Sequence, residues 1–474
     1  MTQCCTRRWF NEHISIPRTM IQSKGPAGVH ASHTTRHEPG KPTVTWFTAA
    51  CLLVSNIIGG GVFTTTGFMA RELGDPIAIL ALWLIGGLIA LAGALCYAEL
   101  GAALPRAGGD YVYLREAYGP LLGFLSGWTS LTIGFGAAVA ASSVGFASYA
   151  LRTIRADGDT GWIGQGIALA LLWSMTAVHA SGLGAGGRLQ RSLTSATVLA
   201  ILVFVVGGLI GGAGQWTHLS EPAPHASMRP GGLLVALIFA LYCYLGWNVA
   251  GYIAAEIDDP PRTIPSILIA GTTTVLGCYL LLNLVYLYAL PVTALAQEPV
   301  LPVAEKVAAA LWGPASARWA AGLICMAIAG GVSAMVWAGP RIYWAMAKDG
   351  LFLPWAAAVH PGSGIPVRAL VLQSAWASIL ILTGTYEQIV VYSGFVLVGF
   401  TALTVGALFV LRRKAPSLAR PYLVPFYPWL PGLLMTGAAG LVGYGLIVRP
   451  MESLLGLGTV LAGLPLYWLW QKQR

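Results

Sequence analysis

The stretch Ser55-Asn56-Ile57-Ile58-Gly59-Gly60-Gly61-Val62-Phe63 interrupts the first long apolar segment of the chain, residues 46–70. Each glycine in a helix interior costs about 1 kcal/mol relative to alanine. Three in succession therefore favour a broken helix, with backbone groups left free to bond something else. Close helix packing is the alternative, because small residues are common where membrane helices meet. A packing motif spaces its glycines four residues apart on one face, whereas this contiguous triplet points in three directions, so we predict a break.

A second interruption, Phe239-Ala240-Leu241-Tyr242-Cys243-Tyr244-Leu245-Gly246-Trp247-Asn248, lies five segments later, within residues 231–255. Its glycine again sits about midway along the segment, flanked by aromatic residues and an amide. Paired interruptions at corresponding places in two halves of a chain are the sequence sign of a transporter binding site. The two halves would be residues 46–213 and 231–413, with five helices each.

Composition places the chain in a membrane. Of its 474 residues, 56% are hydrophobic and only 9% are charged, against roughly 25% charged in soluble domains. About 20 apolar residues form a helix that crosses the hydrocarbon layer, and lipid offers the backbone no other partners. We therefore predict an all-α integral membrane protein with a transmembrane domain over residues 46–474. Its twelve helices are expected near residues 46–70, 76–98, 119–151, 161–181, 193–213, 231–255, 264–290, 318–340, 368–386, 388–411, 428–448 and 453–470.

Basic residues predict the orientation. Residues 1–45 are polar and lack the apolar core of a secretory signal, so we expect a disordered cytoplasmic tail. Cys4 and Cys5 in this tail are either an acylation site or a chance pair. With the tail inside, 20 of the 27 Lys and Arg fall on the cytoplasmic side and 7 outside, as the positive-inside rule requires. We expect both termini in the cytoplasm and a multi-pass protein of the plasma (inner) membrane. The net charge of +9 needs no nucleic acid, although a basic face would also attract anionic membrane lipid.

The two interruptions suit a zwitterion. The N-terminus of a half-helix offers unpaired N–H groups and a positive dipole end to a carboxylate, and freed carbonyls accept hydrogen bonds from an ammonium group. No charged residue lies within the predicted spans away from their ends. Glu99, Glu256 and Arg341 are expected at cytoplasmic edges, where water and partner charges are available. Buried charges mark ion paths or counter-ions, so their absence favours a neutral side chain on the substrate. His179 is interpreted as an interfacial histidine, with a proton relay as the alternative.

Other functional classes find little support. A membrane-embedded enzyme would need clustered carboxylates or histidines, and the one cluster, Glu256-Ile257-Asp258-Asp259, precedes two prolines in a loop. An ion channel would need rings of like groups from several subunits, which an asymmetric twelve-helix chain does not supply. Five of the seven cysteines lie in predicted helices and none in an outside loop, so we expect no structural disulfide, metal or cofactor.

Several motifs together resemble the amino acid–polyamine–organocation permeases, most closely the bacterial members related to L-type amino acid transporters. The motifs run in the family's order from about residue 46 to 368. They are residues 57–63, which resemble the first-helix signature; 97–100 and 105–111, the first cytoplasmic loop; 246–248, 256–260 and 262–265, the sixth helix and its exit; and 341–343 and 347–350, the end of the eighth helix.

The resemblance implies a five-plus-five inverted repeat, two peripheral helices over about 428–470, and transport of amino acids by alternating access. It implies that the substrate carboxylate meets the amides of Gly59, Gly60 and Gly61. The amino group would meet carbonyls at the two breaks, beside Gly246. These carbonyls belong to Ile57, Tyr242 and Leu245.

Two further residues take roles from the resemblance. Tyr242 stands at the family's aromatic gate, with ordinary core packing as the alternative. Asn248 stands where L-type members carry an asparagine, and its alternative role is to satisfy freed backbone groups. Gly134 and Gly136 of the third helix are expected in the pocket wall, together with Tyr242 and Ser333.

Two departures from the family concern coupling. Thr197 replaces a lysine that stands in for sodium in several bacterial members, and Ser333 lacks the neighbouring hydroxyl of sodium-coupled relatives. Exchange or facilitated transport is therefore expected. Proton- or sodium-coupled symport and a transporter-like amino acid sensor are the alternatives. Residues 152–161 contain no cysteine, so no disulfide-linked partner protein is expected.

Overall fold

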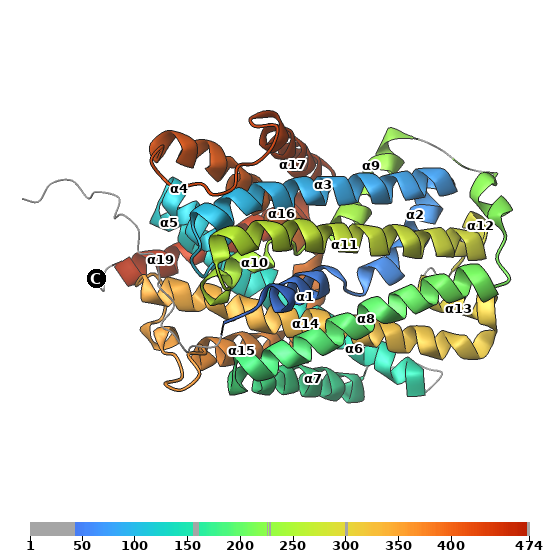
Figure 1. Cartoon of the computed structure of the whole chain (residues 1–474), viewed down its shortest axis with the longest axis horizontal. Coiled ribbons are helices and arrows are strands. Elements are labelled where there is room, and N and C mark those ends of the chain that lie inside the picture. Colours follow the sequence, from blue (N-terminus) through green and yellow to red (C-terminus); the bar gives the residue numbers. More distant parts are fainter. Residues whose placement is uncertain (1–42, 155–160, 225, 227–228, 299–301, 472–474) are drawn as a thin grey trace, which may run out of the picture. The chain divides into compact units, whose positions relative to one another are not determined.

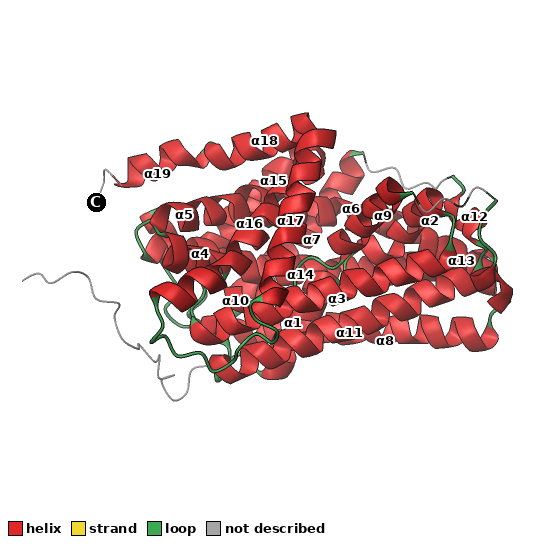
Figure 2. Ribbon diagram, turned by 90° about the horizontal axis from the view of Figure 1, so that it is seen from above, coloured by secondary structure: helices red, strands yellow, loops and turns green. Residues whose placement is uncertain are grey.

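A computed structural model describes residues 43–471, except for 155–160, 225, 227–228 and 299–301. The predicted tail lies outside this range apart from residues 43–45, as do Cys4 and Cys5. The described parts consist of helices joined by loops and contain no strand (Figure 2). One isolated bridge pairs Val44 with Ile257. The all-helical prediction agrees with this, because a helix satisfies its backbone within one segment.

Nine helical segments of the described chain are long and apolar enough to cross a membrane. They are α3 (Pro76–Ala103), α5 to α6 (Pro120–Ile154), α7 (Trp162–Ser181), α8 (Leu183–Gly211), α11 (Pro260–Ala289), η5 to α14 (Pro314–Lys348), Ser393–Lys414 within α16 (Tyr386–Lys414), α17 (Trp429–Val448) and α18 to α19 (Pro450–Trp470). Each overlaps one predicted segment. Three shorter apolar helices, α1 (Trp46–Ile57), α9 (Pro230–Cys243) and α15 (Val367–Thr383), lie in the predicted first, sixth and ninth segments.

The start of α8 differs from the prediction. The helix begins at Leu183, whereas the apolar segment was predicted to begin at residue 193. Charged residues were expected to lie outside the helices, so the segment was predicted to begin after Arg191. In the structure, Arg188 and Arg191 lie within the first turns of α8. Long basic side chains near a helix end can reach water from within a helix. A single residue, Gly182, with φ +147°, separates α7 from α8.

Short helices mark the two ends of the bundle. Figure 1 shows α4 (Asp110–Tyr118) and α10 (Val249–Tyr252) at one end of the long helices, and α12 (Val292–Ala296) and α13 (Val303–Trp312) at the other. We call the end that carries α4 and α10 the basic end, because it is the predicted cytoplasmic end, where most Lys and Arg are expected. Helix α1 contacts α8, α11 and α14 and lies among them in Figure 1.

Ion pairs hold segments together at the basic end. Glu99 accepts from Arg412 Nη2 at 2.6 Å, and Arg341 Nη2 lies 2.7 Å from Glu256 Oε1. The expected partner charges are therefore present. The expected contact with water is wrong for two of these groups, because Glu99 is 1% and Arg341 2% exposed. Burial of this kind is tolerated when the charge is paired and hydrogen-bonded.

Candidate functional site

The first helix is broken where the three glycines predict it. Helix α1 ends at Ile57, a short 3₁₀ turn covers Gly61–Phe63, and α2 (Thr65–Leu73) continues the segment. The amide of Ile58 donates to the Val54 carbonyl, which is the last bond of α1. The amides of Gly59, Gly60 and Gly61 donate no hydrogen bond to any described residue. Three donors are therefore free at this break.

The sixth predicted helix is also broken. Helix α9 ends at Cys243, a turn covers residues 244–248, and α10 follows. Gly246 has φ +117°, and a Cβ at this position would lie 2.7 Å from the side-chain nitrogen and the carbonyl oxygen of Asn56. Only glycine fits such a backbone conformation and so close an approach.

The two breaks touch each other through Asn56. Its side-chain Nδ2 donates to the Gly246 carbonyl at 2.9 Å. Sequence reasoning did not assign Asn56 a role, although it stands directly before the predicted break. An amide at that place can satisfy a carbonyl freed by the second break.

A tyrosine on α11 connects the same two breaks. The Tyr279 hydroxyl lies 2.9 Å from the Ile57 carbonyl and 3.0 Å from the Cys243 carbonyl, so it donates to the ends of both α1 and α9. Its ring packs edge-on against Trp83 with centroids 5.4 Å apart. Tyr279 was missed because it lies in an apolar helix with no local signal, and only the fold brings it to the breaks.

The predicted acceptor carbonyls differ in their partners. The Ile57 carbonyl accepts from the Tyr279 hydroxyl, and the Tyr242 carbonyl accepts from the Leu245 amide at 3.3 Å. The Leu245 carbonyl accepts no hydrogen bond from the described residues. Tyr242 itself is 50% exposed.

Open space adjoins the glycines. A Cβ built on Gly59 would meet no atom within 4 Å, and one on Gly60 would lie 3.4 Å from Ile328 Cδ1. One on Gly61 would come within 2.8 Å of Cys243 Sγ. Space for at least a methyl group is therefore open beside Gly59, and less is open beside Gly60.

Asn248 faces a buried carboxylate. Its Nδ2 donates to Asp110 Oδ2 at 2.9 Å and lies 2.7 Å from the Tyr252 hydroxyl, which also donates to Asp110. Asp110 is 8% exposed and forms no ion pair with a described residue. The asparagine thus connects the second break to α4.

The third helix contributes the two predicted wall glycines. It runs through α5 (Pro120–Thr129), a π-helical turn at Ser130–Gly134 and α6 (Gly136–Ile154). The nearest neighbour of a Cβ on Gly134 is Leu397 of α16, and one on Gly136 would overlap Trp376 of α15. The nearest atoms to these two positions from outside the third helix therefore belong to α15 and α16.

Ser333 and Thr197 lie in different surroundings. Ser333 donates to Gln190 Oε1 at 2.9 Å and lies 2.9 Å from His179 Nε2. Thr197 is 2% exposed, and its hydroxyl has no hydrogen-bond partner among the described residues. His179 lies in the last turn of α7 and is 3% exposed. Its ring is part of a buried polar chain.

That buried chain reaches the first break. Gln190 Nε2 lies 3.3 Å from Thr194 Oγ1, which in turn lies 2.7 Å from Ser55 Oγ. Thr194 also contacts the Cys51 carbonyl at 3.0 Å. Neutral hydroxyls and amides thus join α8 and α14 to the last turn of α1. Buried networks of this kind rigidify their surroundings when every member is satisfied.

Comparison with known proteins identifies a family and several relatives of this chain. A family model described as "Amino acid permease" matches residues 44–452. The serine/threonine exchanger of Bacillus subtilis is 30% identical over 438 residues, covering 90% of this chain and 96% of that protein. The human large neutral amino acids transporter small subunit 2 is 28% identical over 436 residues, covering 89% of this chain and 80% of that protein. The mouse b(0,+)-type amino acid transporter 1 is 27% identical over 423 residues, covering 88% of this chain and 86% of that protein.

Proposed function

The chain belongs to the amino acid permease family and is an integral, multi-pass membrane protein, and from this premise we propose that it moves amino acids with neutral side chains by exchange or facilitated transport. Its relatives include an exchanger of serine and threonine and a transporter of large neutral amino acids. The proposal extends those activities to this chain.

One observation carries the proposal: the first break has three free amides and is joined to the second break through Asn56 and Tyr279. The amides of Gly59, Gly60 and Gly61 would receive the substrate carboxylate, because a helix N-terminus favours an anion. The free Leu245 carbonyl, with those of Ile57 and Tyr242, would receive the ammonium group. Residues 55–64 and 242–249 contain no charged side chain, which suits a neutral substrate.

The approach to this site also follows from the contacts. At the basic end, the Val44 amide donates to the Glu256 carbonyl at 2.7 Å, and the Glu256 side chain pairs with Arg341 and Trp337. We propose that these contacts close that end. Tyr242, at the end of α9, is 50% exposed. We propose that the substrate first enters from the end opposite the basic end. Tyr242 would act as the gate, since a lid must move to commit the substrate.

The same proposal includes twelve membrane-spanning helices and an inverted structural repeat. Helices α1, α9 and α15 would cross together with the nine long segments, which gives twelve spans. The breaks after α1 and α9 would occupy matching places in an inverted repeat, as in other transporters with broken helices. A five-residue turn at the second break and a glycine triplet at the first are the features that support this match.

The test is uptake of a labelled amino acid into proteoliposomes that contain only this protein. We expect uptake to be faster when unlabelled amino acid is preloaded inside, because the loaded carrier reorients faster than the empty one. Replacing sodium with choline should leave the initial rate unchanged. A panel of unlabelled competitors would then identify the substrate. Absence of uptake under all conditions would contradict the transport proposal and favour a sensor.

Proton coupling is the second candidate, and the buried Asp110 favours it. This carboxylate lies next to the second break with Asn248 and Tyr252 as its donors. If uptake accelerates with an inward proton gradient, and Asp110→Asn removes only that acceleration, coupling replaces simple exchange. A steep dependence on sodium would instead indicate an ion site built from Thr197, Ser333 and backbone carbonyls.

A further inference from the structure

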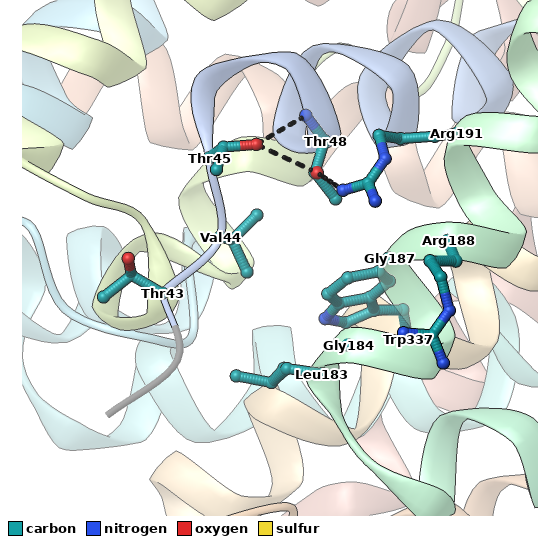
Figure 3. Close-up of a pocket in the computed structure, with 10 residues that line it drawn as sticks. All are labelled: Thr43, Val44, Thr45, Thr48, Leu183, Gly184, Gly187, Arg188, Arg191 and Trp337. Carbon is teal, nitrogen blue, oxygen red and sulfur yellow. Dashed lines mark hydrogen bonds between the residues drawn. The ribbon is translucent and has the colours of Figure 1, made fainter. Parts of the chain in front are cut away.

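A cavity of about 190 Å³ opens at the basic end, away from both helix breaks. Figure 3 shows three elements around it: the chain that leads into α1, the first turns of α8, and Trp337 of α14. Val44, Leu183 and Trp337 form its apolar wall, and Arg188 and Arg191 reach it from α8. The cavity therefore combines an apolar side with two cationic groups.

The two arginines have no carboxylate partner in the described part of the chain. Arg191 Nη1 donates to Thr48 Oγ1 at 2.8 Å (Figure 3). Neither Arg188 nor Arg191 forms an ion pair with a described residue, whereas Arg115, Arg341 and Arg412 at the same end are all paired. Two unpaired guanidinium groups beside one cavity produce a local positive potential that attracts an anion.

The backbone adds to this potential. Helix α8 has 29 residues, and its first residue, Leu183, borders the cavity. No side chain caps its N-terminus at Gly182. Its macrodipole therefore places a partial positive charge at the same opening. Gly184 and Gly187, which have no side chains beyond Cα, also line the cavity and expose the backbone there.

We propose that this cavity binds a phosphate group, from either an anionic lipid headgroup or a soluble phosphate. The forked donors of arginine match phosphate oxygens in pairs. Basic pockets between membrane helices on the cytoplasmic side are suited to lipid headgroups, and the apolar wall would accept the first carbons of a lipid. A bound phosphate would connect the first turn of α1 to α8 through Thr48 and Arg191.

The experiment uses the purified full-length protein in detergent. Native mass spectrometry would measure retention of added phosphatidylglycerol and of phosphatidylcholine, and isothermal titration would measure inorganic phosphate. We compare wild type with Arg188→Gln, with the double variant Arg188→Gln/Arg191→Gln, and with Arg413→Gln as the control. Arg413 is exposed, lies at the same end and outside the cavity, so it reports non-specific attraction.

We expect wild type and Arg413→Gln to retain phosphatidylglycerol in preference to phosphatidylcholine. Each arginine removed should weaken this retention roughly tenfold, the value of a charge-assisted hydrogen bond in affinity. Binding of inorganic phosphate with the same dependence on Arg188 would identify a soluble phosphate as the ligand. Equal retention of both lipids by all variants, with no phosphate binding, would overturn the proposal. Because Arg188 is exposed, its single variant should fold even if the double variant does not.

Discussion

Asn248 Nδ2 donates to Asp110 Oδ2 at 2.9 Å, so the turn that ends the second helix break is joined directly to the loop helix α4. Tyr252, one turn later, donates to the same carboxylate. Asp110 is buried and pairs with no cation of the described residues. Both donors bind Oδ2, whereas Oδ1 has no hydrogen-bond partner among the described residues, so the two bonds offset only part of the lost hydration. Movement of α10 relative to α4 would break both bonds. The contact therefore couples the candidate substrate site to the basic end.

Replacement of Asn248 by leucine tests this coupling. The change leaves a buried carboxylate with one donor fewer, which should cost about 1–3 kcal/mol of stability. We expect a lower melting temperature in detergent and slower uptake in proteoliposomes. Asn248→Asp would be worse, since it places two carboxylates together. Unchanged melting and uptake in Asn248→Leu would show that the contact has no such role.

Gly60→Leu tests the free amides. A leucine here would extend from a Cβ already 3.4 Å from Ile328 into the space proposed for the substrate carboxylate. We expect normal insertion and abolished uptake. Gly437→Leu is the matched control, because Gly437 is exposed on α17 and its Cβ would meet nothing within 4 Å. Normal uptake by a well-expressed Gly60→Leu protein would exclude this site.

Tyr279→Phe tests the bridge between the breaks. Loss of the hydroxyl removes the donor to the Ile57 and Cys243 carbonyls, at a cost of about 1 kcal/mol or somewhat more. We expect a several-fold drop in uptake with a small drop in melting temperature. Tyr286→Phe on the same helix is the control, since that buried hydroxyl has no partner among the described residues. Equal effects of the two substitutions would contradict the bridging role.

Glu305 on α13 gives a test by pH. Burial raises the pKa of its carboxyl above the ordinary 4.5, and Arg152, at 3.4 Å, partly offsets this. The folded state thus holds this proton more tightly than the unfolded state. The stabilisation that comes from the protonated Glu305 carboxyl is full below pH 4.5 and is lost as pH rises through the folded pKa.

The measurement is melting temperature in detergent between pH 4 and pH 7. Glu305→Gln should lose less stability than wild type as pH rises across this range. Glu298→Gln, at an acid with 72% side-chain exposure, is the control and should follow wild type. Identical pH profiles for wild type and Glu305→Gln would contradict the burial argument.

Both helix breaks could be predicted from local sequence. A glycine triplet cannot sustain a helix without cost, and Gly246 needs a positive φ that other residues avoid. The start of α8 could not be predicted in the same way, because charge was taken as the end of a helix. Arg188 and Arg191 extend from the first turns of α8 at the basic end, where the helix continues past the apolar span.

The sequence alone determined the helical membrane class and the two broken helices, because these depend on local hydropathy and on the conformational freedom of glycine. Tertiary structure alone decided which groups meet at the breaks. Tyr279 lies 222 residues from Ile57, and Asn56 lies 190 residues from Gly246. Asp110 likewise lies 138 residues from Asn248. Such pairs leave no trace in local composition, since each hydrogen bond depends on how whole helices pack.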